Sequence, residues 1–153
     1  MAASVLSSIT KKYSKSSHIL KPRLARTCLK HFLDPSKPIG THYGGIIGLQ
    51  AIGGSELVRA LIVPNLKEYD AFLIDSTEDT DNDNNKKGGE MVIEALVDAL
   101  MSLEADSMGA INGLANGHAV ETRKQVAEKI GELLAGRIME LGRPRLVKAI
   151  LEC

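Results

Sequence analysis

The sequence predicts an all-α fold, an α-solenoid built from antiparallel pairs of helices. Hydrophobic residues make up 44% of the 153 residues, which is enough for one domain with a sizeable core. Aromatic residues are only 3%, so the apolar content is Leu, Ile, Val, Ala and Met, as is typical of helix-on-helix packing. These apolar residues recur at helical spacing, and no strand-like alternation of useful length competes. We therefore expect residues 1–153 to form a single helical domain.

The first expected helix pair comprises residues 20–33 and 42–52. Apolar residues at spacings of four, one and three mark one face of the first helix, and the prolines of DPSKP end it. Thr41 is the expected N-cap of the second helix, which Gly53-Gly54 ends with a left-handed residue. Before this pair, the N-terminal segment is expected to form a short amphipathic helix that joins the fold.

Two further pairs are expected, residues 55–73 with 90–104 and residues 119–141 with whatever follows, where Arg145 to Cys153 could start another helix. Pro64 removes a helical hydrogen bond, so the first of these helices either kinks there or breaks and resumes. Between the helices of that pair, STEDTDNDNNKKGGE contains no apolar residue. Because such a stretch cannot contribute to a core, we expect a flexible polar loop at about 76–89.

A second connector is expected at Asp106–Gly117, which holds three glycines and two asparagines. The helix pairs recur roughly at the 40 to 47 residues typical of HEAT or armadillo units. Internal sequence identity is too weak to prove a repeat from the letters alone.

The stretch THYGGIIGLQAIGGSEL carries five glycines, and its spacing fits neither a dinucleotide fingerprint nor a phosphate-binding loop. Glycine inside a helix costs roughly 0.5 to 1 kcal/mol relative to alanine, so these glycines require a reason. Gly44 and Gly48 lie four residues apart, on one helical face. We expect that face to approach a neighbouring helix closely.

The charge is neutral overall but uneven along the chain, because basic residues dominate before Gly40 and an acidic run follows at residues 78–83. A candidate basic patch comprises Lys21, Arg23, Arg26 and Lys30. A nucleic-acid-binding helical domain that uses the basic 11–37 segment is therefore the alternative function, with a weak promoter DNA contact. The segment lacks interleaved aromatic residues, which disfavours that alternative.

The sequence contains no recognisable nucleophile, base and orienting group, and its densest acidic cluster lies in the expected loop. We therefore expect no enzyme, no catalytic residue, no cofactor and no small-molecule substrate. Cys28, His31 and Asp34 do not make the four-ligand pattern of structural zinc, so no metal is assigned. No run approaches the roughly 18 consecutive apolar residues of a membrane span, so no membrane partner is expected.

Three stretches carry a resemblance to a known family: FLDPSKPIGTHYGGIIGLQAIGG, LIVPNL and LGRPRLVKAILEC. They resemble the C-terminal HEAT-repeat domain of the sixth TBP-associated factor, in a fungal-like form. That factor is a subunit shared by the general transcription factor TFIID and the coactivator SAGA. In the family a histone fold precedes this domain, so the resemblance implies that residues 1–153 are an excised domain.

The resemblance implies a nuclear, non-catalytic scaffold of HEAT-like antiparallel helix pairs that acts in RNA polymerase II transcription initiation. Its partners would be other TBP-associated factors and SAGA subunits. The matching positions form a candidate partner-binding or inter-repeat surface: Thr41, His42, Tyr43, Gly44, Arg59 and Pro64. For His42 and Tyr43, the plainer interpretation is that they cap and pack the turn between helices.

Overall fold

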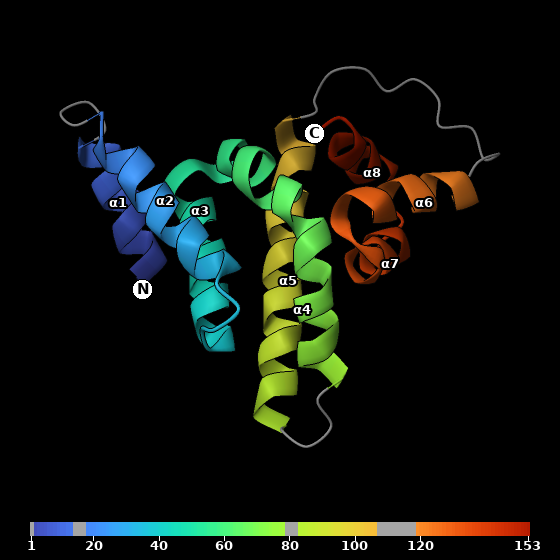
Figure 1. Cartoon of the computed structure of the whole chain (residues 1–153). Helices are drawn as coiled ribbons and strands as arrows, with labels where there is room; N and C mark the ends of the chain where they lie inside the picture. Colours follow the sequence, from blue (N-terminus) through green and yellow to red (C-terminus); the bar gives the residue numbers. More distant parts are fainter. Residues whose placement is uncertain (1, 14–17, 79–82, 107–118) are drawn as a thin grey trace.

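Three groups of helices lie side by side in the computed structural model (Figure 1), which describes residues 2–13, 18–78, 83–106 and 119–153. The groups are α1–α3 at one end, α4–α5 in the middle and α6–α8 at the other end. The elements are α1 (Ala2–Tyr13), α2 (Leu20–Leu33), α3 (Ile39–Leu57), η1 (Val58–Ile62), η2 (Val63–Asn65), α4 (Leu66–Glu78), α5 (Asp83–Asp106), α6 (Ala119–Ile130), α7 (Glu132–Glu140) and α8 (Pro144–Leu151). Because every regular element of the described residues is helical, the predicted all-α class is confirmed.

The first pair consists of α2 and α3, and α1 packs against it as expected of the N-terminal segment. α3 begins at Ile39, before the predicted start, so Thr41 lies inside the helix and its predicted N-cap role is wrong. The boundary residue is instead Pro38, whose extended ψ of 149° sets the turn before the helix. The Thr41 amide then donates to the Pro38 carbonyl over 2.8 Å.

The chain leaves regular α-helical geometry at Gly54 of α3 and again directly after α3 ends. Gly54 has φ 55° and ψ −143°, so the predicted positive-φ glycine is confirmed, but it kinks the helical run instead of ending it, because α3 continues to Leu57. The chain then continues as a π-helical turn, η1, and a 3₁₀ turn, η2, that contains Pro64. Proline has no amide hydrogen to donate to the preceding turn, so the predicted interruption at Pro64 is confirmed in this form.

The predicted polar loop at about 76–89 is shorter than expected, because both neighbouring helices extend into it. The hydroxyls of Ser76 and Thr77 donate to the Leu73 carbonyl and keep the polar end of α4 hydrogen-bonded. A Cβ atom added at Gly89 would lie 3.1 Å from the Ser76 Oγ, so this glycine lets α4 and α5 approach closely. Residues 79–82, and residues 107–117 of the second predicted connector, lie outside the described part of the chain.

The single long helix predicted over 119–141 is wrong, because the chain breaks at Gly131 between α6 and α7. Gly131 has φ 90°, a conformation that residues with a side chain rarely adopt. A Cβ atom there would also lie 2.3 Å from the Asp70 Cγ on α4. After α7, the predicted final helix is confirmed as α8.

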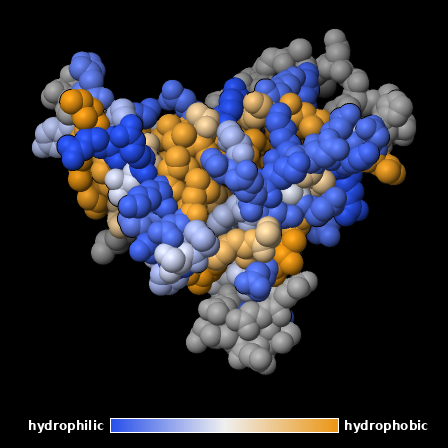
Figure 2. Space-filling model, in the orientation of Figure 1, coloured by the Kyte–Doolittle hydropathy of each residue, from blue (hydrophilic) through white to orange (hydrophobic). Residues whose placement is uncertain are grey.

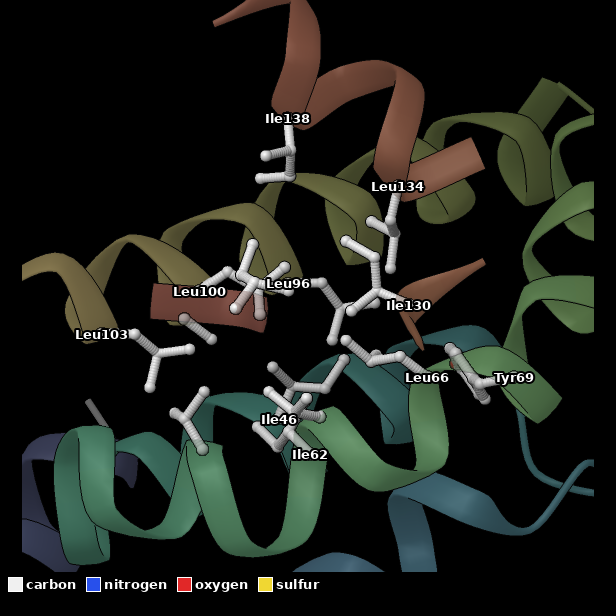
Figure 3. Packing of buried hydrophobic residues seen from close by; sticks show 14 of the residues in the cluster. Ile46, Ile62, Leu66, Tyr69, Leu96, Leu100, Leu103, Ile130, Leu134 and Ile138 are labelled. Carbon is white, nitrogen blue, oxygen red and sulfur yellow. The ribbon is translucent and has the colours of Figure 1, made fainter. Parts of the chain in front are cut away.

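The core runs through all three groups (Figure 3), and its largest side chains come from several helices. Ile46 of α3, Leu66 of α4 and Leu100 of α5 have no exposed surface. Ile130 and Leu134 extend the same cluster into α6 and α7. One hydrophobic cluster thus joins the helix pairs along the solenoid.

One continuous helical run, Ile39–Thr77, is long and apolar enough to cross a membrane by length and composition, with a mean hydropathy of 1.5 in its best window. Polar residues and glycines interrupt its apolar stretches, so the sequence did not predict a membrane span there. The side chains of Ile46, Leu49, Ile62 and Leu66 on this run have no exposed surface, and a helix buried in a protein core can have the same length and hydropathy.

Candidate partner-binding surface

His42, predicted as part of the candidate surface, is completely buried where α3 follows the α2–α3 turn. Its Nδ1 lies 2.8 Å from the Phe32 carbonyl oxygen, and its Nε2 lies 3.1 Å from the Lys37 carbonyl oxygen. Carbonyl oxygens only accept, so whichever ring nitrogen carries the proton donates to one of them. The interpretation of His42 as an exposed recognition residue is therefore wrong, because the ring fastens the turn from inside.

An aromatic cluster surrounds the His42 ring and ties the first helix pair to α4. The ring stacks on Phe72 with centroids 4.4 Å apart, and the Tyr69 hydroxyl lies 2.9 Å from His42 Nδ1. Phe32 of α2 completes the cluster, 4.6 Å from the Tyr69 ring. Burial raises the pKa of Tyr69 above its ordinary value, because the low-dielectric surroundings disfavour the phenolate.

The turn below this cluster is held by Asp34, which follows the last residue of α2. Its carboxylate accepts hydrogen bonds from the Ser36 hydroxyl and the Ser36 amide, at 2.6 Å and 3.1 Å. These bonds hold the pKa of the Asp34 carboxyl below its ordinary value, since they favour the charged form. Hydrogen bonds thus hold the turn from two sides, those of Asp34 from outside and those of His42 from inside.

The closely packed glycines of α3 are Gly45 and Gly48, not the predicted Gly44 and Gly48. A Cβ atom added at Gly45 would lie 2.8 Å from the Cys28 carbonyl oxygen and 2.9 Å from the Phe32 amide nitrogen. One at Gly48 would lie 2.7 Å from the Cys28 sulfur, whereas one at Gly44 would meet no atom within 4 Å. The contacting face is therefore spaced by three residues and faces α2, and Gly44 points away from it.

The other predicted surface residues divide between half-buried and exposed positions. Thr41 and Tyr43 are half-buried, and Tyr43 packs against the core. Gly44, Arg59 and Pro64 are exposed, on α3, η1 and η2 respectively. The structure therefore does not gather the six residues into one exposed patch.

The candidate basic patch lies on α2, next to an apolar groove. Arg23, Arg26 and Lys30 are exposed and follow helical spacing along one face, while Lys21 forms an ion pair of 3.1 Å with Glu56 of α3. The groove has a volume of about 410 Å³ and lies between α2 and the α3–η1 segment. Its lining residues are Lys21, Pro22, Ala25, Arg26, Leu29, Glu56, Leu57 and Leu61. In the orientation of Figure 1, hydrophobic surface shows between α2 and the central helices, with hydrophilic surface around it (Figure 2).

The role of Asp70, which links α4 to the start of α7, was not predicted from the sequence. Its carboxylate oxygens accept hydrogen bonds from the Glu132 and Leu133 amides, at 3.0 Å and 3.3 Å. A side chain of α4 thus caps the first turn of α7, where amide groups have no partner inside the helix. Gly131 was the available signal, because a glycine in a periodic helical pattern marks a break or a close approach. No local pattern connects that glycine with a carboxylate about sixty residues earlier in the chain.

Comparison with known proteins finds relatives that are named as subunits of transcription complexes. Residues 1–67 match the family model described as the TAF6 C-terminal HEAT repeat domain. A Schizosaccharomyces pombe protein, "SAGA complex/transcription factor TFIID complex subunit Taf6", is 35% identical over 152 residues. The match covers 99% of this chain and 32% of the relative, so the chain spans about a third of that protein.

Two Arabidopsis thaliana proteins match over 72 residues, 47% of this chain. They are transcription initiation factor TFIID subunit 6b, 42% identical over 14% of its length, and subunit 6, 43% identical over 13%. No solved structure matches the chain significantly. The resemblance read from the sequence is thus confirmed: residues 1–67 belong to the TAF6 C-terminal HEAT repeat domain family, and the whole chain is a relative of the Taf6 subunits.

Proposed function

We propose that this chain is a non-catalytic protein–protein interaction scaffold of a TFIID/SAGA subunit in RNA polymerase II transcription initiation. The observation that carries the proposal is the 35% identity over 99% of the chain to a protein named as a subunit of both complexes. Its site of action would be the nucleus, and its partners would be other TBP-associated factors and SAGA subunits. The family match of residues 1–67 supports the same assignment.

Two buried polar side chains form hydrogen bonds that hold the structure, which supports a scaffold rather than an enzyme. His42 and Tyr69, which would be candidates for acid–base chemistry, are hydrogen-bonded to each other and His42 also faces backbone carbonyls. These bonds hold the turn and the first helix pair. The relatives are likewise named as complex subunits, and the comparisons give no support to the nucleic-acid-binding alternative.

We place the partner contact on the groove between α2 and the α3–η1 segment. Leu29, Leu57 and Leu61 line it and are only half-buried, so a partner could cover apolar surface there. Lys21, Arg26 and Glu56 also line it, so charged side chains stand beside the apolar ones. Such an apolar centre with charged residues around it is the usual anatomy of an interface.

Co-purification of the tagged chain from nuclear extract tests the proposal. We expect TFIID or SAGA components to be recovered, and a Lys21→Glu/Arg26→Glu variant, changed at the two basic residues of the groove lining, to recover fewer of them. The matched control is Arg123→Glu/Lys124→Glu, which makes the same charge change at exposed positions on α6. Recovery of no component of either complex by the unmodified chain would contradict the proposal. Equal recovery by the two variants would contradict the placement of the contact on this groove.

A further inference from the structure

A second groove, distinct from the one on α2, lies between α5 and α7 and has a volume of about 430 Å³. Its apolar surface comes from Ile93 and Val97 of α5 and from Leu141, which follows α7 and is 44% exposed. Ile93 is buried and Val97 half-buried, so they form a firm base on which an apolar side chain could rest. Its lining on α5 runs along the helix axis from Glu90 to Asp98.

Most of the charged side chains that line this groove are acidic. Glu90, Glu94 and Asp98 follow one another at intervals of four residues along α5, and Glu140 stands on α7. The only basic residue of the lining is Arg137, which donates to both carboxylate oxygens of Glu90 at 2.9 Å and 3.2 Å. Four acids and one base leave the lining with a net charge of −3.

The nearby cation Arg143 does not offset this charge. Arg143 forms an ion pair of 3.1 Å with Glu104, at the other end of α5, and lies outside the groove lining. Glu94, Asp98 and Glu140 are exposed, so their carboxylates are free to face a partner. A cleft lined by one sign of charge concentrates ligands of the opposite sign.

We propose that this groove binds a basic amphipathic helix of a partner protein. The apolar stripe of that helix would rest on Val97 and Leu141, above the buried Ile93, and its Lys or Arg side chains would meet the acidic residues of the lining. Glu90 to Asp98 extends over about 12 Å at 1.5 Å per helical residue, which corresponds to about two turns of the bound helix. An apolar stripe in a groove gives the affinity, and the charges at the rim select the partner. This inference adds the chemistry of one partner segment to the proposed function. It rests on the proposed function only for the statement that the helix comes from another subunit of the complex.

A peptide titration tests the groove without the parent complex. The probe is an amidated, fluorescently labelled peptide of about 14 residues with leucines at i, i+3, i+4 and i+7 and lysines elsewhere. A second peptide carries glutamates in place of the lysines. We expect the lysine peptide to bind, its affinity to fall as salt rises, and the glutamate peptide to bind at least about tenfold more weakly.

Variants localise the binding of the lysine peptide. Glu94→Lys/Asp98→Lys should weaken it at least about tenfold, and Glu94→Gln/Asp98→Asn should weaken it less. Glu121→Lys/Glu128→Lys makes the same charge change on exposed positions of α6 and should leave the affinity within about twofold. Equal loss in the groove and control variants, or equal affinity for both peptides, would overturn the inference. Circular dichroism of each variant verifies that the helices are retained.

Photo-crosslinking in the assembled complex identifies the natural partner segment. A photoreactive amino acid at Asp98 of the parent subunit should crosslink to a segment with apolar residues at helical spacing and Lys or Arg between them. The same amino acid at Glu128 is the control position. If the subunit joins the complex but the Asp98 crosslinks map to a segment without that pattern, the groove inference fails and the proposed function stands. If the subunit joins neither complex, the proposed function fails, and the peptide titration still decides whether the groove selects basic helices.

Discussion

At the scale of single residues, the glycines of α3 show how a helix pair can be fixed by missing side chains. Gly45 faces the Cys28 carbonyl and the Phe32 amide, which are backbone atoms that cannot rotate away. Gly48 faces only the end of the Cys28 side chain, which can adjust. Gly45 is therefore the more demanding position, and its neighbour Gly44 has open space around it.

Gly45→Ala should lower the free energy of unfolding by about 1 to 3 kcal/mol, because the new methyl group pushes α2 and α3 apart. Gly44→Ala is the matched control one position away. It should raise stability by about 0.5 to 1 kcal/mol, since alanine favours the helix and meets no atom within 4 Å. Urea denaturation measures both changes. A stability for Gly45→Ala at or above that of the unmodified chain would show that the two backbones are not in firm contact.

Tyr69 should make stability fall in alkaline solution. Burial raises the pKa of the folded-state hydroxyl above the ordinary value of 10.0, so the stability it contributes is present below pH 10 and is lost as the pH rises further. Tyr69→Phe should cost about 0.5 to 1.5 kcal/mol at neutral pH through the lost hydrogen bond, and this difference should shrink above pH 10.

Denaturation across the alkaline range, with tyrosinate absorbance as a second signal, measures this effect. Tyr13→Phe is the control, because Tyr13 is 47% exposed on α1. A constant difference between Tyr69→Phe and the unmodified chain at every pH would contradict the assigned role of the buried hydroxyl.

At the scale of helices, periodicity predicted which segments are helical but not where all of them end. Apolar spacing identified α2, the α3 segment, α4 and α5, because a buried stripe leaves its period in the sequence. The break at Gly131 escaped the same reasoning, since apolar residues continue in helical register on both sides of it. The helix ends there because Asp70 of α4 caps α7, and a tertiary contact of this kind leaves no local pattern.

The candidate surface was predictable only in part, for a related reason. Sequence reasoning selected His42 and Tyr43 as a pair, yet one helical position separates a completely buried ring from a half-buried one. The plainer interpretation, that His42 packs the turn between helices, agrees with its burial, but its partners, the backbone carbonyls of Phe32 and Lys37, could not be named from the sequence. Likewise, the α5–α7 groove depends on how two distant helices pack, which the spacing of Glu90, Glu94 and Asp98 alone does not tell.

Asp70→Ala should lower stability by about 0.5 to 2 kcal/mol, because it removes the cap from the first turn of α7. The Glu132 and Leu133 amides lose their acceptor, so hydrogen exchange should quicken at the start of α7 more than in α2. Asp75→Ala removes an exposed carboxylate from the same helix and is the matched control. Equal effects of the two changes would mean that the cap contributes nothing to stability.

At the scale of the whole molecule, the two ends of the solenoid differ in how much they bury. α1 contacts α2 and α3, and its only buried residue is Thr10. α8 contacts α5, α6 and α7, and four of its eight residues are buried: Leu146, Val147, Ala149 and Ile150. In a solenoid each unit is stabilised by its neighbours, so the loss of an end should matter in proportion to the apolar surface it covers.

Deleting residues 144–153 should therefore abolish cooperative unfolding, whereas deleting residues 1–13 should only lower the melting temperature. Three of the side chains that α8 buries are large, and burial of each contributes about 1.5 to 3 kcal/mol. Their sum, about 5 to 9 kcal/mol, is comparable to the total stability of about 5 to 15 kcal/mol that is usual for a domain. Removing α8 would also expose the faces of α5 and α6 that it covers, so those helices would lose their fixed positions. Thermal denaturation by circular dichroism distinguishes the outcomes, and a sharp single transition without α8 would show that α1–α7 are stable by themselves.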